Sequence, residues 1–153
     1  MDYVKFILGS AFISTLISGI YKLFLDKKIE KFKTDLQLKF TTEQERLNQK
    51  RNVYINLIDS MAIFIGNRIP PNLQDQYKFN FLQAYDIAWL WASDEVMKAM
   101  SEFLEHNMKK TTGQDWSHDK EKELFAKCIL EMRKDIGFKD SKLDKIHYKF
   151  VNF

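Results

Sequence analysis

The fold is decided by residues 21–65, which read YKLFLDKKIEKFKTDLQLKFTTEQERLNQKRNVYINLIDSMAIFI. These 45 residues contain neither glycine nor proline. Their apolar positions recur at spacings of three, four or seven, which is typical of a helix that packs on other helices. We therefore expect one long helix over about residues 3–65, roughly 95 Å in length. The apolar positions are Leu25, Ile29, Phe32, Leu36, Phe40, Leu47, Tyr54, Ile58, Met61 and Ile65.

A helix of this length is marginal in water unless other helices cover its apolar face. Between Lys27 and Arg51 the remaining surface of the expected helix carries charges of both signs. These two properties favour a stalk that oligomerises through its apolar stripe. The alternative is an ordinary first helix of a small bundle.

The whole chain is poor in helix breakers. Its 153 residues include five glycines and two prolines, where an average chain of this length would carry about 18. β-Sandwiches and barrels need frequent turns and phosphate-binding loops need clustered glycines, so both are excluded. Cys128 is the one cysteine, which excludes an intrachain disulfide framework and a cysteine zinc cluster. The composition predicts an all-α protein.

An uncharged run of 16 residues, Phe6–Tyr21, lies near the start of the chain. Apolar character extends over residues 3–25, and a helix needs about 20 residues to cross roughly 30 Å of hydrocarbon. We therefore predict a transmembrane helix over residues 1–26. A buried core helix and a cleaved signal peptide are the alternatives.

The lysines around this run predict its orientation, because lysine excess marks the cytoplasmic side of a membrane segment. The expected location is the bacterial inner membrane, with a single pass, the N-terminus outside and the C-terminal body in the cytoplasm. A stalk helix is expected over residues 27–67 and a cytoplasmic helical domain over residues 72–153. The lysines that follow the run are Lys22, Lys27, Lys28, Lys31 and Lys33.

The expected membrane helix has a polar face. Ser10, Ser14, Ser18 and Lys22 recur every four residues, so they share one side of a helix. Small residues and hydroxyls favour close contact between membrane helices, and a single helix cannot enclose a pore. We therefore predict a homo-oligomer in which these four residues line a pore. The alternative is that each serine hydroxyl bonds back to a carbonyl of its own helix.

Beyond Pro70 and Pro71 the sequence predicts a compact helical domain. Residues 73–92 are rich in aromatic side chains, and residues 109–117 form a polar loop. Serines, glycine and acidic residues stand where helices should begin or end. The expected boundaries are an N-cap at Ser93, an N-cap at Ser117, a C-terminal glycine at Gly137, and a capping sequence at Ser141–Asp144 that opens a last helix towards Phe150.

The sequence contains no recognisable catalytic arrangement. His106, His118 and His147 lack partners at the spacing of a zinc-binding helix motif. Cys128 lies on an apolar helical face, which favours a core residue over a nucleophile. No nucleophile elbow and no phosphate-binding lysine motif occurs in the sequence. We therefore expect neither an enzyme, nor a metal site, nor a cofactor.

Two short segments combine cations with aromatic rings, in the loop after residue 108 and in the C-terminal tail. Single-stranded nucleic acid is typically bound by basic grooves with stacking rings. The net charge of +3 is modest, but a homotetramer would repeat each patch four times. The alternative is a solvated lysine surface. The candidate ligand residues are Lys109, Lys110, Trp116, Lys142, Lys145 and Lys149.

Two stretches resemble a pattern in small bacterial proteins that join one membrane helix to a helical body. They are YDIAWLWASDEVMKAMSEFLEHN, from Tyr85, and ILEMRKDIGFKDSKLD, from Ile129. In this layout the chain resembles the membrane effector of the Hailong anti-phage system. The resemblance implies a cone-shaped tetrameric ion channel that opens on phage infection. It further implies that single-stranded DNA oligomers, made by a partner nucleotidyltransferase, hold the channel closed.

The leading hypothesis from the sequence is therefore a homo-oligomeric inner-membrane ion channel of anti-phage defence, with a tetramer favoured. Its gating signal would be a single-stranded DNA oligomer or a nucleotide bound to the cytoplasmic part. The alternative is a non-conducting, membrane-anchored helical scaffold or interaction protein.

Overall fold

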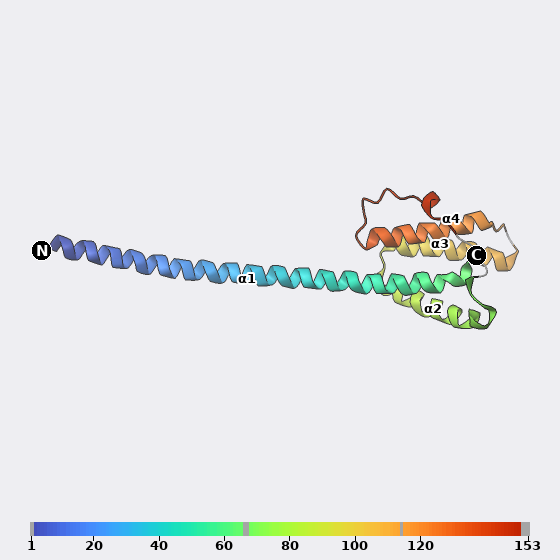
Figure 1. Cartoon of the computed structure of the whole chain (residues 1–153), viewed down its shortest axis with the longest axis horizontal. Helices are drawn as coiled ribbons and strands as arrows, with labels where there is room; N and C mark the ends of the chain where they lie inside the picture. The colour runs from blue at the N-terminus through green and yellow to red at the C-terminus, as the bar shows by residue number, and fades with distance from the viewer. Residues whose placement is uncertain (1, 66–67, 114, 151–153) are drawn as a thin grey trace. The chain divides into compact units, whose positions relative to one another are not determined.

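The computed structural model describes the backbone of residues 2–65, 68–113 and 115–150, and their side chains from Gly19 onward. These residues form helices and connecting segments with no β-strand among them, which confirms the all-α prediction (Figure 1). The elements in chain order are α1 (Asp2–Ser60), η1 (Met61–Phe64), η3 (Pro71–Leu73), α2 (Gln74–Trp91), α3 (Asp94–Thr112), α4 (His118–Asp135) and η4 (Lys145–His147), where η marks a 3₁₀ helix.

Helix α1 extends without a break over 59 residues. Its side-chain hydroxyls do not interrupt it, because Thr34 and Thr42 donate hydrogen bonds to carbonyl oxygens four residues earlier, at 3.0 and 2.9 Å. The expected helix reaches residue 65, whereas α1 ends at Ser60 and tightens into the 3₁₀ turn η1. Helix ends often tighten in this way, because the last carbonyl groups lack α-helical partners.

The chain divides into two compact units, Met1–Glu45 and Arg46–Phe153. The described residues of the first unit all belong to α1. Within it the side chains from Gly19 to Glu45 are all exposed, including those of Leu25, Ile29, Phe32 and Leu36. We call these four residues the α1 stripe, because spacings of four, three and four place them on one side of the helix.

The expected transmembrane helix is not supported. Within the described part of the chain, no helix combines the length with the apolar character that a membrane crossing requires. From residue 22 onward α1 carries lysines and acids every few residues, and charge is costly in hydrocarbon. The prediction of a single-pass inner-membrane protein with an outer N-terminus and a cytoplasmic body is therefore wrong.

The second unit is a helical bundle with one hydrophobic core. α3 and α4 lie side by side in it (Figure 1). The end of α1 contributes Tyr54 and Leu57 to the core, and η1 contributes Met61. Aromatic rings extend this core from α2, through η1, α3 and α4, to the C-terminal tail. Each successive pair has ring centroids 4.9–5.9 Å apart, a spacing that favours edge-to-face contacts. The rings are those of Phe81, Phe64, Phe103, Phe125, Tyr148 and Phe150.

Ser93, Ser117 and Gly137 lie at the helix ends that the sequence predicted for them. The Ser117 hydroxyl accepts the hydrogen bond of the Lys120 backbone N–H at 3.4 Å, as an N-cap should. Ser93 occupies the N-cap position of α3, but its side chain makes no capping hydrogen bond. Gly137 has φ +114°, a conformation that favours glycine, and follows the end of α4.

Two boundaries differ from the prediction. Helix α3 runs to Thr112, four residues into the expected loop, and ends at Gly113 with φ +69°. The expected last helix is only the three-residue turn η4, capped by Asp144. The tail residues Tyr148 and Phe150 pack against Phe125 instead of continuing a helix. Tertiary packing of the two rings therefore outweighs the local helix signal.

Candidate interaction site

Helix α2 has two unlike surfaces, because two of its three buried side chains are alanines. Ala84 and Ala88 are buried, together with Phe81. The two alanines allow α2 to lie close to the core, and most of its bulky apolar side chains are exposed. One surface of α2 borders a groove with α1, and another faces solvent.

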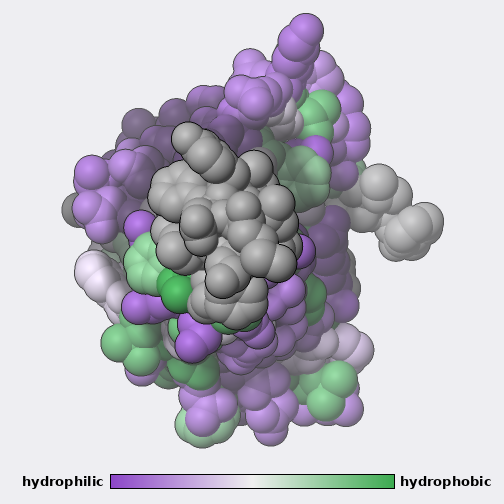
Figure 2. All heavy atoms as spheres, turned by 90° about the vertical axis from the view of Figure 1, so that its left-hand side faces the viewer, coloured by the Kyte–Doolittle hydropathy of each residue, from purple (hydrophilic) through white to green (hydrophobic). Residues whose placement is uncertain are grey.

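The solvent-facing surface carries four large apolar side chains that are 56–81% exposed. At 100° per residue they lie on the side of α2 opposite the alanines. Asp86 is exposed among them. Surface apolar residues scattered singly are ordinary, whereas a cluster of this size marks an interaction surface. We call the cluster the α2 outer face, and its members are Phe79, Leu82, Trp89 and Leu90. Figure 2 shows in green that apolar side chains reach the surface among hydrophilic ones.

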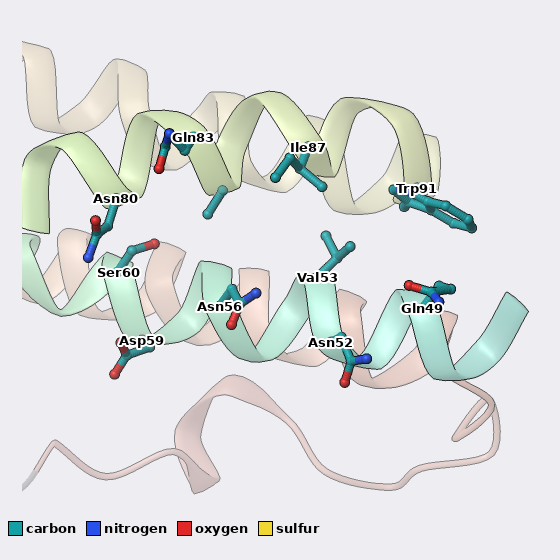
Figure 3. A pocket seen from close by; sticks show the side chains of 11 residues that line it. Gln49, Asn52, Val53, Asn56, Asp59, Ser60, Asn80, Gln83, Ile87 and Trp91 are labelled. Atoms are coloured by element: carbon teal, nitrogen blue, oxygen red, sulfur yellow. The ribbon is translucent and has the colours of Figure 1, made fainter. Parts of the chain in front are cut away.

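A groove of about 380 Å³ separates the end of α1 from α2 (Figure 3). Residues from α1 and α2 face each other across it, with Trp91 near Gln49 at one end and Asn80 near Ser60 at the other. Both walls carry carboxamides, three from α1 and two from α2. The lining residues are Gln49, Asn52, Val53, Asn56, Asp59, Ser60, Asn80, Gln83, Ala84, Ile87 and Trp91.

The lining of this amide groove limits the ligands that it suits. Among its eleven described residues Asp59 carries the charge, and there is no lysine, arginine or histidine. The Asn80 carbonyl oxygen accepts a hydrogen bond from Gln76 at 2.8 Å, and the Ser60 hydroxyl donates to the Leu57 carbonyl at 2.9 Å. Carboxamides both donate and accept hydrogen bonds. The groove therefore suits neutral or cationic polar groups and disfavours phosphate.

A polar cluster inside the bundle fixes the end of α1 against α4. The Lys50 ammonium donates to both Asp135 oxygens at 2.9 and 2.8 Å, and the Tyr54 hydroxyl donates to the same carboxylate. The Lys50 and Asp135 side chains are only 11% and 14% exposed. Burial by itself would raise the pKa of Asp135, but hydrogen bonds from Lys50 and Tyr54 hold that pKa below its ordinary value. Burial, reinforced by the hydrogen bond to Asp135, raises the pKa of Tyr54.

A second polar cluster surrounds Trp116 at the turn between α3 and α4. The Lys110 ammonium lies 4.5 Å from the centre of the indole ring, within the range of a cation–π contact. The His106 ring stacks on the Trp116 ring, with their centroids 6.4 Å apart, and the centroid of the His118 ring lies 6.0 Å from that of Trp116. The Nδ1 atom of His118 also lies within hydrogen-bonding distance of the buried Glu121 carboxylate, 3.0 Å from its Oε2 atom.

The lysines of the C-terminal tail are not equivalent. Lys145 pairs with Glu123 of α4 at 2.5 Å, and Lys120 pairs with the other oxygen of that carboxylate at 2.9 Å. Hydrogen bonds from Lys145 and Lys120 lower the pKa of Glu123 to about 2, and the bond to Glu123 raises the pKa of Lys145. Lys142 and Lys149 are exposed, with no ion pair described for either. One of the three tail lysines predicted to bind a ligand is therefore neutralised by an acidic partner.

The candidate residues from the sequence are placed as follows. The side chains of Ser10, Ser14 and Ser18 lie outside the described residues, and Lys22 is exposed on α1. Lys110 and Trp116 are brought together, and the exposed Lys109 lies beside Lys110 on α3. Lys142, Lys145 and Lys149 belong to the tail, where Lys145 has its own acidic partner.

No metal or nucleophile site emerges from the described residues. They include no group of three His, Cys, Asp or Glu side chains that could hold a metal ion. Cys128 is fully buried, and burial raises the pKa of its thiol to about 12, so it packs as a core residue.

The α2 outer face and the amide groove were missed by reasoning on the sequence. The available signal was that the apolar residues of 73–92 are not confined to one side of a helix, so one core cannot cover all of them. The chain matches no protein-family model, no curated protein and no solved structure.

Proposed function

We propose that this chain is a self-associating helical interaction protein, which acts through binding rather than catalysis. The observation that carries the proposal is the α1 stripe. Its four apolar side chains are 39–67% exposed, and the described residues of their unit form one helix that does not cover them.

The spacing of the α1 stripe supports a helix–helix contact. At 100° per residue Leu25, Ile29, Phe32 and Leu36 lie within an arc of about 60°. Covering one such side chain contributes about 1.5–3 kcal/mol. A lone helix is marginal in water, so association with another helical surface stabilises both the interface and the helix itself.

The channel expected from the sequence is not part of this proposal, because it depended on a membrane span. The resemblance to the Hailong effector stays a prediction. Two parts of the earlier hypothesis do not need a membrane span, namely self-association and a nucleic-acid ligand.

Replacing Phe32 with aspartate is expected to weaken self-association by about 10- to 100-fold, since it removes one buried ring and adds a charge. Sedimentation velocity over a concentration series measures the effect. Leu38→Asp is the matched control, because Phe32 and Leu38 are both 67% exposed but lie about 120° apart around the helix. A wild-type chain that stays monomeric, or equal losses in both variants, would contradict the proposal.

A nucleic-acid ligand is the second candidate function, and the contact between Lys110 and Trp116 favours it. A cation–π contact at an exposed site contributes about 0.5–1 kcal/mol. Stacking of a base on an aromatic ring contributes about 1–3 kcal/mol. A base could therefore displace Lys110 from the ring and leave its ammonium to a phosphate.

Binding of an oligodeoxythymidylate of about 12 nucleotides, followed by fluorescence anisotropy at several salt concentrations, tests this candidate. The variant Lys109→Gln/Lys110→Gln is expected to reduce the slope of log K against log salt by about 1.4, since each phosphate contact contributes about 0.7. Lys78→Gln on α2 is the control, because Lys78 already pairs with Asp75 at 2.9 Å. A wild-type slope near zero would contradict phosphate binding.

A further inference from the structure

We infer that the α2 outer face binds the α1 stripe of a second copy of this chain, so that copies associate head to tail. The inference rests on the proposed self-association and identifies the surface that receives α1.

The α2 outer face requires a partner because of its size and composition. Leu90 is 81% exposed, and Trp89, Leu82 and Phe79 are each more than half exposed. Tryptophan is among the residues that contribute most to binding energy at protein interfaces. The spacing of these residues along one helix suits another helix laid against it.

The charges of the two surfaces are complementary. Residues 22–39 of α1 contain six lysines and three acidic residues, a net charge of +3, and Lys28 and Lys33 flank the stripe. Helix α2 contains Asp75, Asp86 and Lys78, a net charge of −1. Asp86 lies within the α2 outer face, where a lysine beside an incoming stripe would meet it. Such complementarity orients partners and suppresses wrong pairings.

Pairing of like surfaces is less favourable. Two α1 helices bring net charges of +3 together along the same stripe. Two antiparallel α2 helices, related by a twofold axis at the middle of the outer face, place their Asp86 carboxylates about 4.5 Å apart along the helix axis. Like charges at such positions are destabilising, so α1 against α2 is the favoured combination.

This contact uses two different surfaces, so it is heterologous. Every copy offers one α1 stripe and one α2 outer face. Heterologous contacts form a ring where the rotation closes and an extending chain where it does not. Two singly defective copies should therefore complement each other, because each keeps the half that the other has lost.

The experiment mixes the variants Phe32→Asp and Leu90→Asp and measures the mass of each species by sedimentation velocity. Each variant alone is expected to be monomeric at concentrations where the wild type associates. Their equimolar mixture is expected to form a 1:1 heterodimer and nothing larger. Met108→Asp is the control, since Met108 is 66% exposed on α3 and belongs to neither of the two surfaces. Circular dichroism checks that each variant remains folded.

The alternative outcomes separate this inference from the proposal on which it rests. If Phe32→Asp prevents association while Leu90→Asp associates like the wild type, α1 does not bind α2, and the inference is overturned while self-association stands. If neither substitution affects association, both are overturned. Failure of the two monomeric variants to complement each other would also overturn the head-to-tail contact.

Discussion

Replacing Asp135 with alanine is expected to lower the free energy of unfolding by about 3–5 kcal/mol, measured by urea denaturation at neutral pH. The substitution leaves the Lys50 ammonium buried without its counter-ion and removes the acceptor of the Tyr54 hydroxyl. Breaking a buried pair is costly because the remaining charge keeps its desolvation penalty. Asp119→Ala is the control, because Asp119 is 96% exposed and lies 4.0 Å from Lys122. The control should change stability by less than about 1 kcal/mol.

The dependence on pH provides a second measurement of the same cluster. The folded protein holds the pKa of Asp135 below its ordinary value of 3.8. A lowered pKa contributes stability above the unfolded value, and that contribution is lost as pH falls through the folded pKa. The difference between wild type and Asp135→Ala should therefore be constant above about pH 5 and shrink below about pH 4. A difference that grows on acidification would contradict the assignment of Asp135 as a buried carboxylate.

Replacing Phe103 with alanine should destabilise the bundle to a similar degree, by about 3–5 kcal/mol. Phe103 is fully buried, and its ring lies 5.3 Å from Phe64 and 5.9 Å from Phe125. The substitution opens a cavity between α3, η1 and α4, so it removes transfer free energy and packing contacts together. Thermal and urea unfolding, followed by circular dichroism, measure the loss.

Met108→Ala on the same helix is the matched control for Phe103. Met108 is exposed, and surface substitutions usually change stability by less than about 0.5 kcal/mol. Equal losses at the two positions would mean that Phe103 is not part of the packed core.

Local signals in the sequence predicted the helices well where a helix boundary depends on residues within one or two turns of it. The absence of glycine and proline over residues 21–65 predicted an unbroken helix, and α1 is unbroken as far as Ser60. Ser117 caps α4 and Gly137 follows its end. The prediction of a last helix was wrong because Tyr148 and Phe150 pack against Phe125, a contact that no local signal reveals.

The candidate site was predictable only in part, for a related reason. Lys110 and Trp116 are six residues apart and meet at one turn, so their proximity is close to a local property. Lys145 was expected to be available to a ligand, but it pairs with Glu123, which is 22 residues earlier in the chain. Pairing across that separation depends on how the tail folds back on α4. The membrane span was predicted from an uncharged run, and the described helices do not support it.

The sequence by itself determined that this protein is all-helical, because helix breakers are scarce and apolar residues recur with helical period. It also determined that α1 carries an apolar stripe along one side. Only the tertiary structure decided that Phe81, Ala84 and Ala88 face the core, which leaves Phe79, Leu82, Trp89 and Leu90 exposed. The reason is physical: periodicity states which residues share a side of a helix, whereas packing decides which side is covered.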